Sequence, residues 1–238
     1  APRALPLMRS STGAITAGDY DQDGDIDIFT GGRLIPGRYP LAAPSYLLLN
    51  QGDGSFIKQS DQIDSELQQL VLVTAAQSID LTQDGRLDIL LAGEWMPLTA
   101  VLNLADGWQI RRDFFGTATN GWWQSLHLAD LDGDGDQDIV AGNIGENTSL
   151  KVSPEMPASL YVGDFDQNGT IDPLLTHYIQ GKPYPFYSRD NLFGQLTSLR
   201  KKFTSYEAYA DAQIEDILEP EQLQTAQVLK AQMGASVW

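Results

Sequence analysis

Carboxylates recur at every second position in the stretch Asp-Leu-Asp-Gly-Asp-Gly-Asp-Gln-Asp, which runs from Asp130 to Asp138. Side chains at its first, third, fifth and ninth positions can converge on one centre, and the seventh residue can add its backbone carbonyl. Gly135, at the sixth position, permits the sharp turn that this convergence needs. Because carboxylates at this density repel one another strongly, the pattern predicts a loop folded around a hard cation, and Ca²⁺ suits its oxygen ligands.

The same nine-residue frame occurs again over residues 19–27, 80–88 and 164–172, each time with glycine at the sixth position. A single copy leaves open the alternative of an Asp-Gly turn with solvated carboxylates. Copies that keep the glycine and the ligands in phase favour calcium, and they predict about four structural Ca²⁺ ions. The predicted ligand residues are Asp19, Asp21, Asp23, Asp25, Asp27, Asp80, Thr82, Asp84, Arg86, Asp88, Asp130, Asp132, Asp134, Asp136, Asp138, Asp164, Asp166, Asn168, Thr170 and Asp172.

In chain order the four loops are residues 19–27, 80–88, 130–138 and 164–172. The second loop is predicted to be the weakest of the four sites. It has Thr82 in place of the carboxylate at the third position, and a Thr hydroxyl is a poor ligand. The fourth loop has Asn168 in place of the carboxylate at the fifth position. Fewer charged ligands generally mean weaker Ca²⁺ binding. Arg86 lies at the seventh position of the second loop, where only its carbonyl is needed.

Short apolar runs enter and leave each loop, as in Ala75 to Ile79 before the second loop and Ile89 to Ala92 after it. Their length and alternation predict β-strands, so that each loop joins the two strands of a hairpin. An EF-hand is excluded, because that motif needs flanking helices and a bidentate Glu at position twelve. The residues at position twelve are Thr30, Leu91, Ala141 and Leu175.

The composition of the 238-residue chain fits a packed and strongly acidic protein, with 42% hydrophobic residues and a net charge of -17. The loops hold half of the 32 acidic residues, and four Ca²⁺ ions would offset about half of the net charge. Without a stripe of Lys and Arg, a nucleic-acid partner is not expected. No cysteine is present, which excludes disulfides and thiolate sites.

The compartment is predicted from the metal. Extracellular calcium modules commonly bind at about 10⁻⁴ to 10⁻³ M, so we expect an extracellular, periplasmic or outer cell-surface location. The sequence contains no signal peptide and no membrane-spanning run. We therefore expect the chain to be a piece of a longer exported protein.

The chain is predicted to be all-β over residues 1–190, as a partial β-propeller of about three or four blades with the loops in its hairpins. The fourth loop follows the third too closely for a complete blade, which leaves open whether it begins its own. From Leu192 onward apolar residues recur at helical spacing, and Pro220 is placed to begin another helix, from about Glu221 to Met233. Residues 191–238 are therefore predicted to be a helical segment, either an insertion or the start of a further blade.

Four further segments carry a resemblance to a known group of proteins: residues 46–56 (Tyr-Leu-Leu-Leu-Asn-Gln-Gly-Asp-Gly-Ser-Phe), 93–97, 121–125 and 201–210. With the loops, they make the chain resemble the FG-GAP and VCBS repeat proteins, which include the integrin α-chain propeller. The chain is most similar to bacterial VCBS-repeat proteins related to cartilage acidic protein, which are often joined to an ASPIC/UnbV domain that is not visible here. The resemblance implies a calcium-bearing propeller and adhesion or ligand binding, and because family propellers have about seven blades it also implies a larger parent chain.

The leading hypothesis is a non-enzymatic binding or adhesion module with structural calcium and a protein or glycan ligand. The alternatives are a carbohydrate-active enzyme, since paired carboxylates are abundant, and a scaffold for a domain elsewhere in the parent chain. No catalytic residue is predicted, because the loops account for nearly all of those pairs and no nucleophile, phosphate-binding or zinc motif is present. Large aromatic residues either fill the space between blades, which we favour, or face the ligand. The residues considered for ligand contact are Trp95, Trp122, Trp123, Tyr184 and Tyr187.

Overall fold

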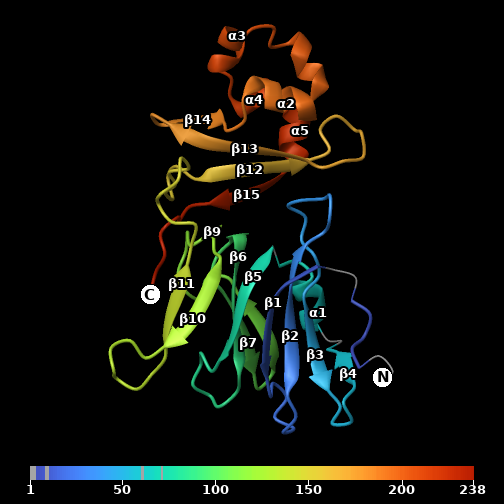
Figure 1. Cartoon of the computed structure of the whole chain (residues 1–238), viewed down its shortest axis with the longest axis vertical. Helices are drawn as coiled ribbons and strands as arrows, with labels where there is room; N and C mark the ends of the chain where they lie inside the picture. The colour runs from blue at the N-terminus through green and yellow to red at the C-terminus, as the bar shows by residue number, and fades with distance from the viewer. Residues whose placement is uncertain (1–3, 9–10, 60–61, 71) are drawn as a thin grey trace.

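The computed structural model describes residues 4–8, 11–59, 62–70 and 72–238, and it is mainly β. Within those residues the strands form four antiparallel sheets, of four, five, two and four strands. Three sheets stand side by side, and the fourth lies across one end of them beneath a layer of short helices (Figure 1). The prediction of a mostly β chain built from antiparallel sheets is confirmed. No helix among the described residues is both long and apolar enough to cross a membrane.

The first two sheets are simple meanders, in which each strand pairs with the next one along the chain. The first consists of β1 (Ser11–Gly18), β2 (Asp27–Leu34), β3 (Tyr46–Asn50) and β4 (Phe56–Lys58). The second consists of β5 (Val73–Ile79), β6 (Asp88–Met96), β7 (Thr99–Leu104) and β8 (Gly107–Arg111), with β9 (Gly121–Trp122) beside the far end of β6. Helix α1 (Gln62–Leu67) connects the two sheets, and Leu67 lies in the core that they share.

The third sheet contains the hairpin of β10 (Ser125–Ala129) and β11 (Asp138–Gly142). The C-terminal end of the chain returns to it, because Val237 pairs with Ala141 in an antiparallel bridge. The two residues exchange backbone N–H to C=O hydrogen bonds of 2.9 and 3.0 Å. Gly145 also donates its N–H to the carbonyl of Gly234 at 2.8 Å.

The register of this bridge matches the third strands of the first two sheets. Ala141 is three residues past the end of its loop. The equivalent residues are Thr30 in β2 and Leu91 in β6. They pair with Tyr46 and Thr99, the first residues of β3 and β7. Val237 therefore stands where a third strand begins. The chain between β11 and this bridge, which includes the fourth loop, leaves the third sheet and returns to it at Val237.

The fourth loop lies in a separate sheet. That sheet has the strand order β14 (Lys182–Pro185), β13 (Asp172–Ile179), β12 (Ala158–Gly163) and β15 (Gln227–Ala231). Its loop, between β12 and β13, is at the right-hand end of the upper sheet in Figure 1, whereas the other three loops point toward the bottom of that view. All four loops join the strands of antiparallel hairpins, as predicted.

The helical prediction for the C-terminal segment is only partly correct. The segment contains α2 (Arg189–Gln195), η1 (Thr197–Lys201), α3 (Tyr206–Ala210), α4 (Ile214–Ile217) and α5 (Pro220–Thr225). The amphipathic pattern is divided because Ser188 and Ser205 cap new helix starts, each accepting a hydrogen bond from a backbone N–H three residues later. The helix expected to reach Met233 is wrong, since α5 ends at Thr225 and β15 pairs with β12.

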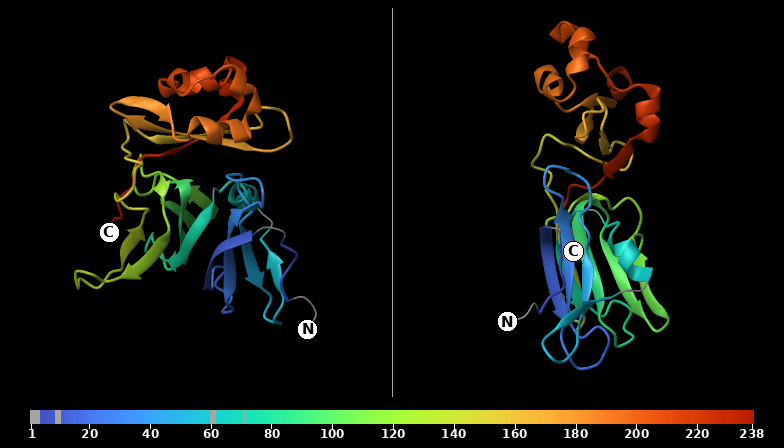
Figure 2. Two further views of the ribbon diagram at one scale, coloured as in Figure 1. Left: turned by 45° about the horizontal axis from the view of Figure 1, so that its top comes forward. Right: turned by 90° about the vertical axis from the view of Figure 1, so that its right-hand side faces the viewer.

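The fourth sheet is covered on both faces. Phe165 and Leu174 pack against apolar residues of α2 to α4, including Leu192 and Ile214. On the other face Leu160 and Leu229 join a cluster that includes Trp95 and Trp122 of the second sheet. Figure 2 shows from two further sides that the helices remain on the outer face of this sheet. The predicted division at residue 190 stays a prediction, although β15 links the two sides of it.

Candidate metal centre

The four loops share one backbone conformation. The sixth-position glycines all have positive φ angles, between 86° and 98°, as the sequence predicts: Gly24, Gly85, Gly135 and Gly169. The fourth position is also left-handed in every loop, with φ between 56° and 79°: Gln22, Gln83, Gly133 and Gln167. Glutamine has no marked preference for this conformation, so it could not be predicted from the sequence. Two left-handed residues in six turn the chain back on itself.

The same two hydrogen bonds hold the first and ninth carboxylates in all four loops. The sixth-position glycine N–H donates to the first-position carboxylate over 2.8 to 3.1 Å, on Asp19, Asp80, Asp130 and Asp164. The second-position N–H donates to the ninth-position carboxylate over 2.8 to 3.0 Å, on Asp27, Asp88, Asp138 and Asp172. These bonds fix both carboxylates before any cation is bound.

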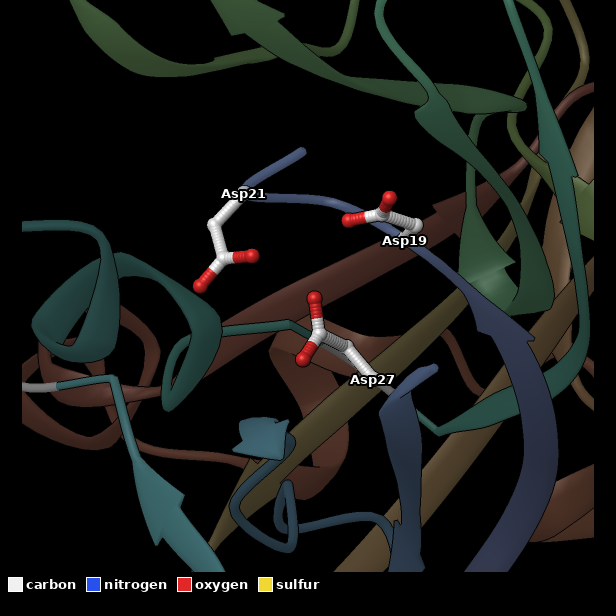
Figure 3. Close-up of side chains that lie close together, drawn as sticks. All are labelled: Asp19, Asp21 and Asp27. Atoms are coloured by element: carbon white, nitrogen blue, oxygen red, sulfur yellow. The ribbon is translucent and has the colours of Figure 1, made fainter. Parts of the chain in front are cut away.

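Carboxylates from the first, third and ninth positions converge in three of the loops. In the first loop one oxygen from each of Asp19, Asp21 and Asp27 lies within 4.8 Å of the others. Figure 3 shows the three carboxylates directed toward a common space, with Asp19 just after β1 and Asp27 at the start of β2. The equivalent groups are Asp130, Asp132 and Asp138, and Asp164, Asp166 and Asp172.

The fifth-position side chains do not join these clusters. Asp23, Asp134 and Asn168 instead accept a hydrogen bond from the N–H of the seventh residue, at 2.8 to 3.1 Å. Asp84 does the same toward Arg86 at 2.9 Å. It therefore stays a prediction that the fifth-position side chains are ligands. The same holds for the predicted backbone-carbonyl ligands at the seventh position, which are Asp25, Arg86, Asp136 and Thr170.

The second loop has no triplet of carboxylates, because Thr82 occupies the third position. Its hydroxyl oxygen is nonetheless shielded from solvent and has no hydrogen-bond partner. Asp19 Oδ1, in the first loop, is in the same state, and these are two of five such atoms among the described residues. Burying a polar atom without a partner is costly, and a hard cation removes that cost by ligation to oxygen. The residues of both loops therefore fit an oxygen-ligated cation such as Ca²⁺.

The ninth carboxylates also hold the third strand, which the sequence did not predict. The other oxygen of Asp27 accepts from the N–H of Asn50 at 2.8 Å, and that of Asp88 from Asn103 at 2.7 Å. Each asparagine is the fifth residue of its strand, in Tyr-Leu-Leu-Leu-Asn and Thr-Ala-Val-Leu-Asn. The Leu-Asn pair at the same place in both strands was the feature of the sequence that could have indicated this contact. Each ninth carboxylate in the first two sheets thus joins the loop to β3 or β7.

Burial alters the proton affinity of several loop carboxylates. Desolvation raises the pKa of Asp88 and of Asp172, both of which are buried. Desolvation also raises the pKa of Asp21, and the negative charge of Asp27 adds to the effect. These three carboxylates therefore hold protons more tightly than they would in an unfolded chain, and protons compete with a cation for the same oxygens.

Acidification should therefore reduce the stabilisation that Ca²⁺ provides. A raised carboxylate pKa contributes stability to the metal-free fold below the ordinary Asp pKa, and that contribution is lost as pH rises through the raised value. As pH falls from neutral toward the ordinary Asp pKa, the metal-free protein thus gains stability from these groups, while protons displace Ca²⁺. The measurement is the unfolding midpoint with and without Ca²⁺ at neutral pH and near the ordinary Asp pKa. An equal calcium increment at both would contradict the expectation.

The three tryptophans considered for ligand contact are buried, as the packing interpretation predicts. Trp95 and Trp122 are 5% and 6% exposed and meet edge to face, with ring centroids 5.1 Å apart. Trp123 is fully buried and donates its indole N–H to the Thr119 carbonyl at 3.0 Å. These rings belong to the clusters of buried side chains between the sheets.

Tyr184 and Tyr187 remain available in part, since both are half-buried. Tyr184 lines a cavity of about 400 Å³ between the β13–β14 hairpin and the segment around α3, together with Lys182 and Tyr209. The Tyr209 hydroxyl donates to the backbone carbonyl of Tyr187 at 2.7 Å, which anchors the wall of the cavity. A ligand at either tyrosine stays a prediction.

Comparison with known proteins identifies one part of the chain. Residues 80–141, from the second loop to the end of the β10–β11 hairpin, match the family model of the FG-GAP-like repeat. No curated protein matches the chain. The matched region contains two of the four loops, together with β6, β10 and most of β11. The chain therefore carries an FG-GAP-like repeat at its centre.

Proposed function

We propose that the chain is a non-enzymatic calcium-binding module of an exported or cell-surface protein, and that its Ca²⁺ ions are structural. The buried oxygen of Asp19, which has no hydrogen-bond partner, carries the proposal. One oxygen of Asp19 lies within 4.8 Å of an oxygen of Asp21 and of Asp27, and carboxylates this close repel one another unless a cation lies between them. The same hydrogen-bond pattern recurs in all four loops, which favours one shared role for them.

Calcium in these loops would act on the fold rather than on a substrate. Ca²⁺ supplies positive charge and accepts six to eight oxygen ligands in a flexible arrangement. The first and ninth residues belong to opposite strands of one hairpin, so ligation from both ties the strand ends together. In the first two sheets the ninth carboxylate also holds β3 or β7. Each occupied loop of the first two sheets would therefore brace three strands.

The proposed architecture is a partial β-propeller of the VCBS-repeat type found in relatives of cartilage acidic protein. Its support is the meander order of the first two sheets and the third-strand position of Val237 in the third. The first three sheets stand side by side with their loops at one end (Figure 1). We propose these sheets as successive blades, with the fourth sheet and its helices as an insertion that carries its own loop.

The surface would bind a protein or a glycan. The cavity beside Tyr184 and Lys182 offers aromatic faces, an ammonium group and the amide of Gln180, a combination that suits sugar hydroxyls or a peptide backbone. The net charge of -17 disfavours nucleic acid. Loops of this kind are expected to fill only where calcium is abundant, which supports an extracellular, periplasmic or cell-surface location.

The test is a count of bound ions on the full chain. After chelation, native mass spectrometry at rising Ca²⁺ should show up to about four ions, of which the last binds weakest because Thr82 gives the second loop a poor ligand at its third position. Mg²⁺ at equal concentration should bind less, since it demands a stricter octahedral geometry. Binding of no Ca²⁺ would refute the proposal.

A matched pair of variants separates site binding from general acidity. Asp132→Ala removes one convergent carboxylate from the third loop and should lower the count by one. Asp113→Ala removes the same charge from an exposed residue outside the loops, where Asp113 pairs with Arg111 at 2.9 Å. The count should be unchanged in that variant. Equal losses in both would mean that Ca²⁺ binds diffusely to an acidic surface.

A further inference from the structure

Asn103 holds residues of two different loops at once. It is buried near the end of β7, where its backbone N–H donates to Asp88 in the second loop at 2.7 Å. Its side-chain amide donates to the backbone carbonyl of Tyr20, in the first loop, at 2.6 Å. The N–H of Tyr20 donates in turn to Asp27 at 2.9 Å. A continuous path of hydrogen bonds therefore joins the ninth carboxylates of the two loops.

Tyr20 is fixed to the second sheet by its side chain as well. It is 1% exposed, its ring packs edge to face against Trp108 with centroids 6.0 Å apart, and its hydroxyl shares a hydrogen bond of 2.7 Å with Ser78. Tyr20 lies between Asp19 and Asp21 in the chain. Its position therefore sets the direction in which both carboxylates leave the backbone.

A second contact joins the tips of the same two loops. The side-chain amide of Gln22 donates to the backbone carbonyl of Gly85 at 3.0 Å. Gln22 and Gly85 both lie in the left-handed part of their loops, where the chain reverses. A change in either loop tip thus reaches the other directly.

No comparable bridge joins the second loop to the third. A cavity of about 320 Å³ lies between them, lined in part by Asp80, Gln83 and Asp136. In the described part of the chain, no hydrogen bond runs from residues 80–88 to residues 130–138. The fourth loop belongs to a different sheet. The bridging contacts therefore single out the first two loops as a pair.

We infer that Asn103 is a positioning residue for both loops, and that the first and second loops bind Ca²⁺ with positive cooperativity. The inference rests on the proposed function. An ion in one loop would immobilise the path through Asn103 and Tyr20, so that less of the chain remains to be ordered when the other loop fills. Such coupling is reciprocal, so either ion strengthens binding of the other by the same factor.

The four loops can be observed separately because each has one sixth-position glycine. In the ¹⁵N-labelled full chain, the backbone amide signals of Gly24 and Gly85 report on the first and second loops as Ca²⁺ is added. Asp21→Ala disables the first loop without touching the bridge, because Asp21 is exposed and bonds only within its loop. It should raise the Ca²⁺ concentration at the Gly85 midpoint about fivefold or more.

The matched control is Asp132→Ala, the same change in the third loop, which should leave the Gly85 midpoint unchanged. In an Asn103→Ala background, Asp21→Ala should no longer raise the Ca²⁺ concentration at the Gly85 midpoint. In an Asn50→Ala background it should still do so, because the Asn50 amide bonds to Ile26 of its own loop. If Asn103→Ala fails to fold, Gln22→Asn replaces it: the shorter amide cannot reach Gly85, and the effect of Asp21→Ala should shrink.

Two results would overturn the inference, and they differ. If Gly24 and Gly85 both respond to Ca²⁺ but Asp21→Ala leaves the Gly85 midpoint in place, the loops bind independently and the proposed function survives. If no loop glycine signal moves up to about 10 mM Ca²⁺, well above the range of extracellular calcium modules, the proposed function itself fails.

Discussion

Adding Ca²⁺ to the chelated protein should raise its thermal unfolding midpoint by about 15 to 30 °C. One site at a hundredfold excess of ligand over Kd contributes about 2.7 kcal/mol, so the three loops with converging carboxylates contribute about 8 kcal/mol together. For a chain of this size, each kcal/mol shifts the midpoint by about 2 to 4 °C. The measurement is a melting curve after exhaustive chelation, repeated with excess Ca²⁺ and with Mg²⁺.

The geometry of the loops ranks the variants in this experiment. Asp130→Ala removes a carboxylate that converges with Asp132 and Asp138. It should abolish the third loop's contribution to the rise in unfolding midpoint caused by Ca²⁺. Asp134→Ala removes a fifth-position carboxylate that accepts a hydrogen bond from the N–H of Asp136. It should reduce the calcium-dependent rise in unfolding midpoint by less than Asp130→Ala does. Asp23→Ala should behave like Asp134→Ala. An unchanged midpoint on chelation would mean that the loops are solvated turns.

The loops could be predicted from the sequence because their structure is local. The carboxylate spacing and the sixth glycine act within nine residues, and Gly24 and Gly135 have the left-handed conformation expected of them. The left-handed fourth residues could not be predicted, since Gln22 and Gln167 carry no sign of it. The convergence of the third side chain but not the fifth was also hidden, because both positions hold aspartate in the first and third loops.

The path of the chain after the third loop could not be predicted, because distant pairings decide it. The helical pattern after Pro220 is real through Thr225, but beyond it Leu229 pairs with Leu160 on the open edge of β12. Burial of Leu229 and Ala231 on one face of that sheet outweighs local helix preference. The return of Val237 to Ala141 likewise leaves no trace in local spacing.

Replacing Asp88 by Ala should destabilise the chelated protein by about 3 kcal/mol or more. Asp88 is fully buried and accepts three backbone hydrogen bonds: from Leu81 at 2.9 Å, Thr82 at 3.3 Å and Asn103 at 2.7 Å. Alanine leaves these donors without partners, at about 1 to 3 kcal/mol each when buried. This loss is a large part of a typical domain stability of about 5 to 15 kcal/mol.

Two companion variants isolate the cause of that loss. Asp84→Ala removes an exposed carboxylate from the same loop and should change stability by about 0.5 kcal/mol or less in chelator. Asp138→Ala removes the ninth carboxylate of the third loop, which is half-buried and accepts from Leu131 at 2.8 Å, so it should cost about 1 to 3 kcal/mol. Urea unfolding in chelator gives all three values. If Asp138→Ala cost as much as Asp88→Ala, the attachment of β7 through Asn103 would contribute nothing, and the ninth carboxylate would serve its loop alone.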